Sequence, residues 1–502
     1  MLFNSFEFIC IFLPITLLIF FQIGKRGYYK IATAWLVATS LFFYSWWNPS
    51  YLGLLLFSLL FNYFVGSALN QRMTILSNKR LLLILGIAVN LALIGYFKYA
   101  NFFISNVNAV LDTAFNLNTI ILPLGISFFT FQQIAYLVDA YQGETKEYSF
   151  LNYCLFVTFF PQLIAGPIVH HKEVMFQFVN KSIYRFNTED MAVGITIFLL
   201  GLSKKVLLAD TIAVYATPVF AAAAEGAHLT FYEAWTGALA YSLQLYFDFS
   251  GYSDMAIGAA RMFGIKLPLN FNSPYKAVSI IDFWRRWHIT LSNFLRDYLY
   301  IPLGGNRKGQ LRRYTNLMIT MLLGGLWHGA GWTFVFWGGL HGTYLIINHQ
   351  WNSFQRLLGH DLRNSQWWSR WLGIIVTFAA VVVSWVFFRA EDMETAIAML
   401  TAMVGANGFS LSSSLPIDKK VVLLMLLCVW LLPNTQQWLG QHNPALDYQL
   451  GVENTSGWSK YLWKKLQWQP TIFTSLSVGL LGFMAILKMV SVTHSEFLYF
   501  NF

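Results

Sequence analysis

Charged residues are scarce in this chain of 502 residues. Asp, Glu, Lys and Arg make up 11% of the sequence, against about 25% in an average soluble domain, which excludes a typical soluble protein. Cysteine is scarcer still, and Cys10, Cys154 and Cys428 all lie within apolar stretches without CxxC or CxxH spacing. Buried packing is therefore favoured over a disulfide or a metal site, and we expect no bound metal.

Hydrophobic residues are abundant instead, at 56% of the chain, with 18% aromatic. Apolar stretches recur from residues 8–23 to residues 472–490, and several are shorter than the roughly 17 residues that a membrane span needs. Others are broken by Gly or Pro, which favours re-entrant segments. No repeat and no linker separates the stretches. The sequence predicts an all-α polytopic membrane protein, one integral domain over residues 1–502, with about eleven helices crossing or entering the bilayer.

Basic residues in the short loops predict the orientation. The start MLFNSFEF has no basic region and no cleavage site, so it is expected to be a retained helix rather than a signal peptide. Basic residues follow the first and third apolar stretches, whereas the turn at residues 48–50 has no charge: Lys25, Arg26, Lys30, Arg72, Lys79 and Arg80. Cytoplasmic loops are rich in Lys and Arg, so the N-terminus is predicted to be extracytoplasmic. The net charge of +10 is consistent with such basic cytoplasmic loops, and nucleic-acid binding is the weaker interpretation because the basic residues are spread between apolar stretches.

The densest basic cluster lies in residues 282–313, DFWRRWHITLSNFLRDYLYIPLGGNRKGQLRR. Its apolar residues recur between Phe283 and Tyr298 close to the i, i+3, i+4 pattern of an amphipathic helix lying along the membrane interface. Two interpretations stay open. The cations contact lipid headgroups, or they bind a phosphate-rich cytoplasmic ligand, because guanidinium groups bind phosphate bidentately.

The apolar run that follows, Leu322 to Leu340, contains one ionisable side chain, His328. Four glycines surround it and allow helices to approach closely: Gly324, Gly325, Gly329 and Gly331. A buried histidine can be a packed core residue, or it can be a general base, since imidazole titrates near neutrality. His288, taken alone, is more often structural. In a continuous helix His341 would lie on roughly the opposite face from His328, which argues against a metal site formed by that pair.

These residues carry a resemblance. FWRRWHITLSNFLRDYLYIPLGGN, followed by LGGLWHGAGWTFVFWGGLHG, resembles the signature of the membrane-bound O-acyltransferase (MBOAT) family, in its bacterial branch of alginate and polysaccharide O-acetylation subunits. Supporting pieces occur from end to end: MLFNSFEFICIFLPI, PLGISFFTFQQIAYLVD, FFPQLIAGPI, YFDFSGYSDMAIG and the terminal FLYFNF. The resemblance implies a ring of helices around a central channel in which a cytoplasmic acyl thioester meets an acceptor from the other face.

The resemblance also implies roles for two histidines. His328 matches the essential histidine of the family's WHG motif, and His288 the second recurrent histidine, in the RWH motif. We expect His328 to act as the general base that removes a proton from an acceptor hydroxyl. For the donor phosphates the candidates are Arg285, Arg286 and Arg296, although lipid headgroups explain these residues nearly as well.

Five further polar residues are candidates for the channel: Asp248, Gln244, Asn270, Asn272 and Asp297. Asp248 lies among aromatic residues and is a candidate polar partner. An ordinary pair with Arg296 is the favoured role of Asp297. The other three are weaker suggestions, which rest on their place within apolar stretches.

Two related hypotheses differ in the molecule that donates the acyl group. The chain's length and its two ends are more similar to the polysaccharide O-acetylation subunits, which use acetyl-CoA, than to the D-alanyl transferases served by an acylated phosphopantetheine carrier protein. We therefore expect acetyl transfer from cytoplasmic acetyl-CoA across the bacterial inner membrane, with no bound cofactor. An extracytoplasmic acetyltransferase partner would then modify an exopolysaccharide or cell-wall glycan. The alternatives are acyl transfer from the carrier protein, a transporter of glycan or lipid, and a non-enzymatic scaffold.

Overall fold

The computed structural model describes residues 1–70, 78–117, 120–145, 149–360, 366–410, 415, 417–446, 448, 467–491 and 497–498. Over these residues the secondary structure is helical, and no β-strand occurs there beyond an isolated bridge between Pro268 and Leu446. The prediction of an all-α fold is confirmed. The helices divide into two compact units, which we describe separately.

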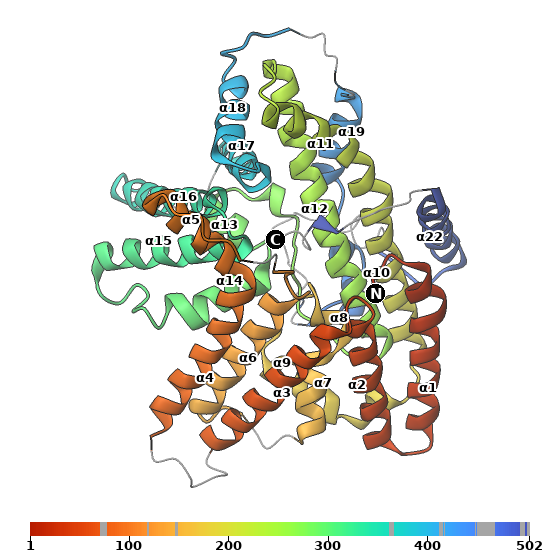
Figure 1. Cartoon of the computed structure of the whole chain (residues 1–502). Coiled ribbons are helices and arrows are strands. Elements are labelled where there is room, and N and C mark those ends of the chain that lie inside the picture. The colour runs from red at the N-terminus through yellow and green to blue at the C-terminus, as the bar shows by residue number, and fades with distance from the viewer. Residues whose placement is uncertain are drawn as a thin grey trace. The chain divides into compact units, whose positions relative to one another are not determined.

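The first unit comprises Met1–Ser203, Tyr252–Leu269 and Thr435–Thr493. Its α-helices pack as neighbouring pairs, among them α1 with α2, α4 with α6, and α10 with α22 (Figure 1). They are α1 (Leu13–Lys25), α2 (Tyr29–Ser45), α3 (Ser50–Leu69), α4 (Lys79–Ile94), α5 (Ala100–Leu111), α6 (Ile126–Tyr141), α7 (Phe150–Thr158), α8 (Phe160–Leu163), α9 (His171–Val179), α10 (Thr188–Ser203), α20 (Thr435–Trp438) and α22 (Ile472–Ser491). Shorter π and 3₁₀ segments are η1 (Glu7–Phe12), η2 (Gly95–Tyr99), η3 (Lys181–Tyr184) and η7 (Gly440–His442).

The second unit comprises Lys204–Gly251, Asn270–Asn434 and His494–Phe502, and the division falls inside the long helix α12 (Phe231–Met262). Its other α-helices are α11 (Asp210–Ala224), α13 (Ile280–Trp284), α14 (Ile289–Leu295), α15 (Gly309–His328), α16 (Trp332–Leu357), α17 (Trp367–Arg389), α18 (Met393–Met403) and α19 (Lys419–Leu431). The shorter segments are η4 (Lys204–Ala209), η5 (Pro274–Lys276) and η6 (Arg296–Tyr300).

Six helical stretches among the described residues are long and apolar enough to cross a membrane: Glu7–Lys25, Ser50–Leu69, Lys79–Leu111, Thr188–Ala224, Trp367–Arg389 and Ile472–Ser491. A hydrocarbon core of about 30 Å needs about 20 residues at 1.5 Å each. The chain is a multi-pass membrane protein. The number of about eleven crossing or entering helices, the single domain and the central channel stay predictions.

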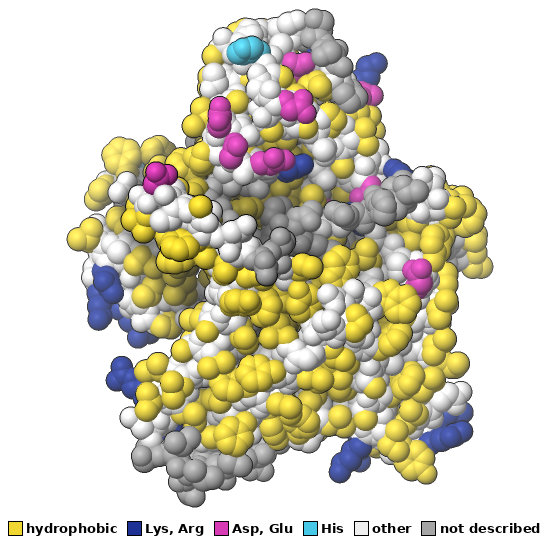
Figure 2. Space-filling model, viewed as in Figure 1, with side chains coloured by type: hydrophobic (Ala, Val, Ile, Leu, Met, Phe, Trp, Pro, Cys, Tyr) yellow, Lys and Arg dark blue, Asp and Glu magenta, His cyan; other side chains and the backbone are white. Residues whose placement is uncertain are grey.

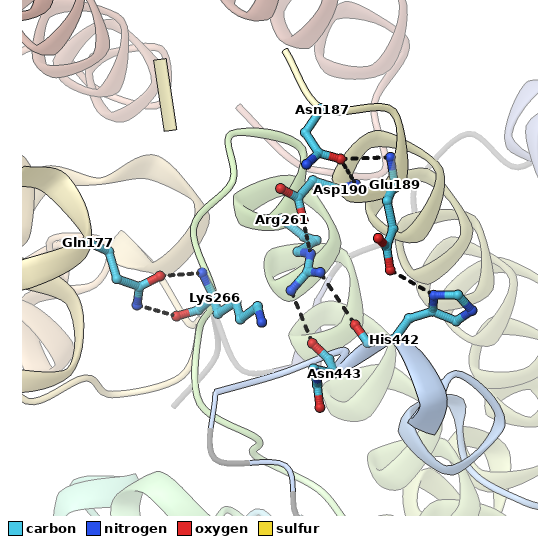
Figure 3. Close-up of polar contacts among 8 residues, drawn as sticks. All are labelled: Gln177, Asn187, Glu189, Asp190, Arg261, Lys266, His442 and Asn443. Carbon is cyan, nitrogen blue, oxygen red and sulfur yellow. Dashed lines mark hydrogen bonds and ion pairs between the residues drawn. The ribbon is translucent and has the colours of Figure 1, made fainter. Parts of the chain in front are cut away.

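A buried arginine ties α10, α12 and the segment after α20 together in the first unit (Figure 3). The Arg261 guanidinium lies 2.8 Å from the Asp190 carboxylate and donates to the backbone carbonyls of His442 and Asn443. Arg261 is 4% exposed. An arginine this deep needs partners for its charge and for its donors, and these three elements supply them.

The apolar run from Leu322 to Leu340 is two helices, not one. Helix α15 ends at His328, and α16 begins at Trp332, so the chain turns back on itself. The two helices pack along each other, as Figure 1 shows at the left. Treating the run as a continuous helix was therefore wrong, and His328 lies at the turn of a helical hairpin.

Glycines cause this close packing. A Cβ atom on Gly325 would lie 2.2 Å from the carbonyl oxygen of Phe334, and one on Gly329 would lie 2.2 Å from the Phe334 ring. No other residue fits such a helix contact without displacement. The prediction of a close helix approach is confirmed at Gly325, whereas Gly329 lies in the turn, and a Cβ atom on Gly324 or Gly331 would meet nothing closer than 3.2 or 3.5 Å.

The predicted amphipathic helix between Phe283 and Tyr298 is also interrupted. Helix α13 ends at Trp284, and α14 begins at Ile289. Between them His288 has a left-handed backbone, with φ of 43°, which is uncommon for a residue other than glycine. Placing His288 on a continuous helix was wrong, because the apolar spacing stays in phase across the break and does not reveal it.

Candidate functional site

The His328 side chain is 4% exposed and lies in an aromatic cage. Its ring centroid is 4.9 Å from Trp327, 5.1 Å from Trp337 and 5.2 Å from Phe388. The ring of His288 is the next imidazole, at 6.4 Å. The segment between α13 and α14 thus lies close to the turn of the hairpin, and the two histidines selected from the sequence come together although forty residues separate them in the chain.

Asn270 fixes the tautomer of His288. The Asn270 side-chain oxygen accepts from the backbone N–H of Thr290 at 3.3 Å, and it lies 3.1 Å from His288 Nδ1. Because a backbone N–H can only donate, the atom facing both groups is an oxygen, and Nδ1 must carry the proton. Nε2 of a neutral His288 then holds the lone pair. The His288 side chain is fully buried, and its strained backbone is held in place by these contacts.

His341 has the opposite tautomer. The indole N–H of Trp284 donates to His341 Nδ1 at 3.3 Å, so this nitrogen is the acceptor. His341 Nε2 then donates to Ser384 Oγ at 2.9 Å, and that hydroxyl donates to the Val381 carbonyl. Both ring nitrogens are used, which indicates a residue that positions its neighbours. This network could not be predicted from local sequence patterns, because Trp284 and Ser384 lie far from His341 in the chain.

A cationic pocket of about 550 Å³ lies where α13 meets the ends of α15 and α16 that are remote from the hairpin turn. Four arginines line it: Arg285, Arg286, Arg313 and Arg356. Asp282 is the one acidic residue in the lining and pairs with Arg286 at 2.9 Å. The pocket therefore carries a surplus of positive charge.

His349 completes the lining of this pocket. Its Nδ1 accepts from the Arg313 guanidinium at 2.5 Å. Burial, and then the neighbouring charge of Arg313, lower the pKa of His349 to about 4. The ring is therefore neutral at pH 7 and orients Arg313. Arg313 was part of the basic cluster at residues 282–313 but was not named as a donor ligand, and His349 and Arg356 were not selected from the sequence, since the hairpin brings α15 and α16 together here.

A second, more apolar pocket of about 380 Å³ adjoins the first and shares Ile281, Arg285 and His349 with it. Its lining extends inward to Trp284 and Met321. Met321 precedes His328 by seven residues, which is two turns along one face of α15.

The side chains of Trp284 and Trp337 lie between this pocket and the candidate base His328. The Trp284 ring lies 6.0 Å from Trp337, which in turn contacts His328. The two pockets thus form a cationic entrance and an apolar path that stops at two tryptophans in front of His328.

The remaining candidates lie as follows. Arg296 lines the apolar pocket but is already paired with Asp297 through two hydrogen bonds of 2.7 and 2.9 Å. Asn272 accepts from the Asn434 side chain at 2.9 Å. Gln244 is buried, and its side-chain oxygen has no hydrogen-bond partner among the described residues.

Asp248 belongs to a buried charged triad. It lies 2.7 Å from Lys205 Nζ, which also contacts Asp210 at 2.8 Å. The backbone N–H of Leu498 donates to the second oxygen of Asp248. The geometry therefore gives Asp248 a role in fixing the C-terminal segment to α12. Within the described part of the chain, no three His, Cys, Asp or Glu side chains gather as metal ligands would.

Comparison with known proteins agrees with this architecture. The family model for MBOAT, the membrane-bound O-acyltransferase family, matches residues 41–388. The chain is 48% identical to the peptidoglycan O-acetyltransferase of Helicobacter pylori over 439 residues, which cover 82% of this chain and 81% of that protein. It is 39% identical to the probable alginate O-acetylase AlgI of Pseudomonas putida over the full length of both chains.

More distant relatives carry a different activity in their names. The teichoic acid D-alanyltransferase of Streptococcus thermophilus is 30% identical over 282 residues, which cover 53% of this chain and 68% of that protein. The similarity to the O-acetylating relatives is thus higher and extends over more of the chain. Together with the hairpin that carries WHG, these matches show that the chain is an acyltransferase and belongs to the membrane-bound O-acyltransferase family.

Proposed function

We propose that this acyltransferase takes an acetyl group from cytoplasmic acetyl-CoA and passes it across the inner membrane for O-acetylation of an extracellular or cell-wall polysaccharide. The observation that carries the proposal is the order of contacts from the cationic pocket, through the apolar pocket lined by Trp284, to Trp337 and the cage around His328. The names of the relatives support a glycan as the final acceptor. Family membership favours acyl transfer over the transporter and scaffold hypotheses.

The cationic pocket suits the phosphates of CoA. Arg285 and Arg356 form no ion pair within the described residues, so their guanidinium groups are available for bidentate phosphate binding. Arg313 is oriented by His349 for the same purpose. Arg296 already forms an ion pair with Asp297. In this proposal Arg313 and Arg356 therefore take its place as residues that bind the phosphates of the acyl donor.

The apolar pocket suits the pantetheine arm, which would extend from the arginines toward His328. Trp284 and Trp337 stand between the pocket and the imidazole. We propose that their side chains move aside when the thioester enters. In the closed form the cage excludes water, which protects the thioester from hydrolysis.

The chemical step is acyl transfer through His328. Its ring nitrogen accepts the proton of an acceptor hydroxyl while the hydroxyl oxygen bonds to the thioester carbonyl carbon. The carbon–sulfur bond then breaks, and the imidazolium returns the proton to the thiolate of CoA. His288, with its lone pair on Nε2, lies beside this site as the second histidine. The acceptor would come from the extracytoplasmic side, where a partner acetyltransferase completes glycan modification.

A reconstituted assay tests this function. The whole chain in sealed vesicles receives acetyl-CoA labelled in the acetyl group, and release of free CoA thiol is measured with and without an extracytoplasmic extract. We expect His328→Ala to lower thiol release by about 10² to 10⁴-fold, the usual contribution of a positioned base. His442→Gln in the first unit, a histidine outside the site, should keep full turnover. Unchanged turnover by His328→Ala would refute the mechanism.

The donor is tested in the same vesicles. Acetyl-CoA is compared with acetyl-CoA that lacks the 3′-phosphate (acetyl-dephospho-CoA) and with an acylated phosphopantetheine carrier protein. The proposal expects acetyl-CoA to react best and loss of the phosphate to raise KM. Preference for the acylated carrier would favour the D-alanyl type of transfer instead.

A further inference from the structure

A groove of about 770 Å³ lies on the first unit along α1, outside the proposed acetyl-transfer site. One part of its lining is apolar and comes chiefly from α1: Pro14, Leu17, Leu18, Phe21, Phe186 and Met191. The other part, where α1 ends, is basic and consists of Lys25, Arg26 and Arg185. The groove therefore has an apolar length and a cationic end.

Close packing at Gly24 builds this groove. A Cβ atom on Gly24 would lie 2.5 Å from the carbonyl oxygen of Tyr184, so the glycine allows η3 to lie directly against α1. The chain leaving η3 then places Arg185 beside the end of α1. Phe186 packs edge-on against Phe21, with ring centroids 5.7 Å apart, and both rings line the groove.

The basic end of the groove carries positive charge that no described acidic residue neutralises. Lys25, Arg26 and Arg185 are all exposed, and none forms an ion pair with a described residue. No acidic side chain lines the groove. Three cations at one end of an otherwise apolar groove attract an anion that carries apolar chains. Figure 2 shows Lys and Arg side chains at the lower right, beneath the hydrophobic surface of this unit.

The dimensions fit one leaflet. From Pro14 to Lys25 the helix rises by eleven residues, which at 1.5 Å each is about 16 Å, half of a hydrocarbon core of about 30 Å. This part of α1 belongs to the candidate span Glu7–Lys25, and Leu18 is 62% exposed. The groove from Pro14 to its cationic end therefore spans about one leaflet, and the cations lie where the headgroup of a lipid would be.

We propose that this groove is a binding site for one anionic glycerophospholipid of the cytoplasmic leaflet. The acyl chain lies along Pro14, Leu18 and Phe21, and the phosphate contacts Lys25, Arg26 and Arg185. Free phosphate or CoA would leave the apolar wall exposed, because neither carries an acyl chain of that length. The site is independent of the acetyl-transfer reaction, and only its leaflet depends on the proposed orientation.

Native mass spectrometry of the full chain tests the site. The protein is released from detergent in the presence of equal phosphatidylglycerol and phosphatidylcholine, and the bound lipids are counted. We expect one phosphatidylglycerol to be retained selectively. The double variant Lys25→Gln, Arg26→Gln should lower its retention at least tenfold. The matched control is Lys79→Gln, Arg80→Gln at the start of α4, which removes the same charge away from the groove and should retain the lipid.

Two further arms identify the ligand. Leu17→Trp fills the apolar part and should also reduce retention, whereas 50-fold molar excess of inorganic phosphate over lipid should not displace it. Equal loss in both double variants would show general surface attraction and overturn the proposal. Displacement by phosphate would overturn it too, since the site would then bind the anion alone; this arm needs no variant and so does not depend on folding of Leu17→Trp.

Discussion

At the scale of single residues, the sequence identified the two histidines but not what holds them. His328 and His288 stand out because they lie in an apolar segment and in recurrent motifs. Asn270 was selected only as a polar residue in an apolar stretch, eighteen residues before His288. Its role follows from hydrogen-bond directions, which depend on the path of the chain from Asn270 to the start of α14. Local periodicity carries no information about that path.

Asn270 is therefore predicted to be a positioning residue. Asn270→Ala removes the acceptor for His288 Nδ1–H, so the imidazole loses its fixed tautomer and orientation. We expect kcat for acetyl transfer to fall about tenfold or more, a part of what a positioned histidine contributes, with little change in KM for acetyl-CoA. Thr290→Val is the control, because it removes a contact to Asn270 without touching His288. A change confined to KM would contradict this role.

Arg313 is predicted to bind the donor, although its neighbour Arg312 looks equivalent in sequence. Arg313 lines the cationic pocket, whereas Arg312 is exposed and outside the pocket lining. A hydrogen bond to a charged group contributes about 1.5–3 kcal/mol, so Arg313→Gln should raise KM for acetyl-CoA about 10- to 100-fold. Arg312→Gln should leave it nearly unchanged. Steady-state kinetics at fixed ionic strength measure both, and equal effects would indicate nonspecific attraction.

At the scale of elements, composition predicted helices correctly but not their breaks. The run from Leu322 to Leu340 has the length of a span, yet α15 ends at His328 and α16 turns back. The glycines that flank His328 were the available signal. They indicate close approach, but the sequence does not say whether the neighbour is another helix or the next part of the same run.

The hairpin contact predicts opposite effects of one substitution at two glycines. Gly325→Ala places a Cβ atom 2.2 Å from the Phe334 carbonyl oxygen, whereas Gly339→Ala meets nothing closer than 3.5 Å. Overpacking costs about 1–3 kcal/mol, so Gly325→Ala should lower the thermal unfolding temperature and acetyl transfer together. Gly339→Ala should be neutral or stabilising, because alanine favours a helix by about 0.5–1 kcal/mol. Equal unfolding temperatures for the two variants would contradict the packing seen at Gly325.

At the scale of the whole molecule, amino-acid composition was enough to predict the class of protein. The basic residues in the loops predict the orientation of the chain in the membrane. Few charges and many apolar runs leave little other than a multi-pass helical protein. Counting the membrane helices from the sequence was harder, because several apolar stretches are broken or are shorter than a full span. Buried ion pairs such as Arg261 with Asp190 could not be predicted from the sequence for another reason. They join residues 71 positions apart, and no local pattern links them.

The orientation of the chain gives the last prediction, which concerns the two ends of α2. Tyr28, at its start, follows Lys25 and Arg26, whereas Ser50, just beyond its end, lies at an uncharged turn. Both side chains are exposed. Because the basic end is predicted to lie in the cytoplasm, Ser50→Cys in a chain whose three native cysteines are replaced should react with a membrane-impermeant maleimide in intact cells. Tyr28→Cys should react only after the membrane is opened. The reverse pattern would place the cationic end of α1 outside, and the phospholipid groove would then face the other leaflet.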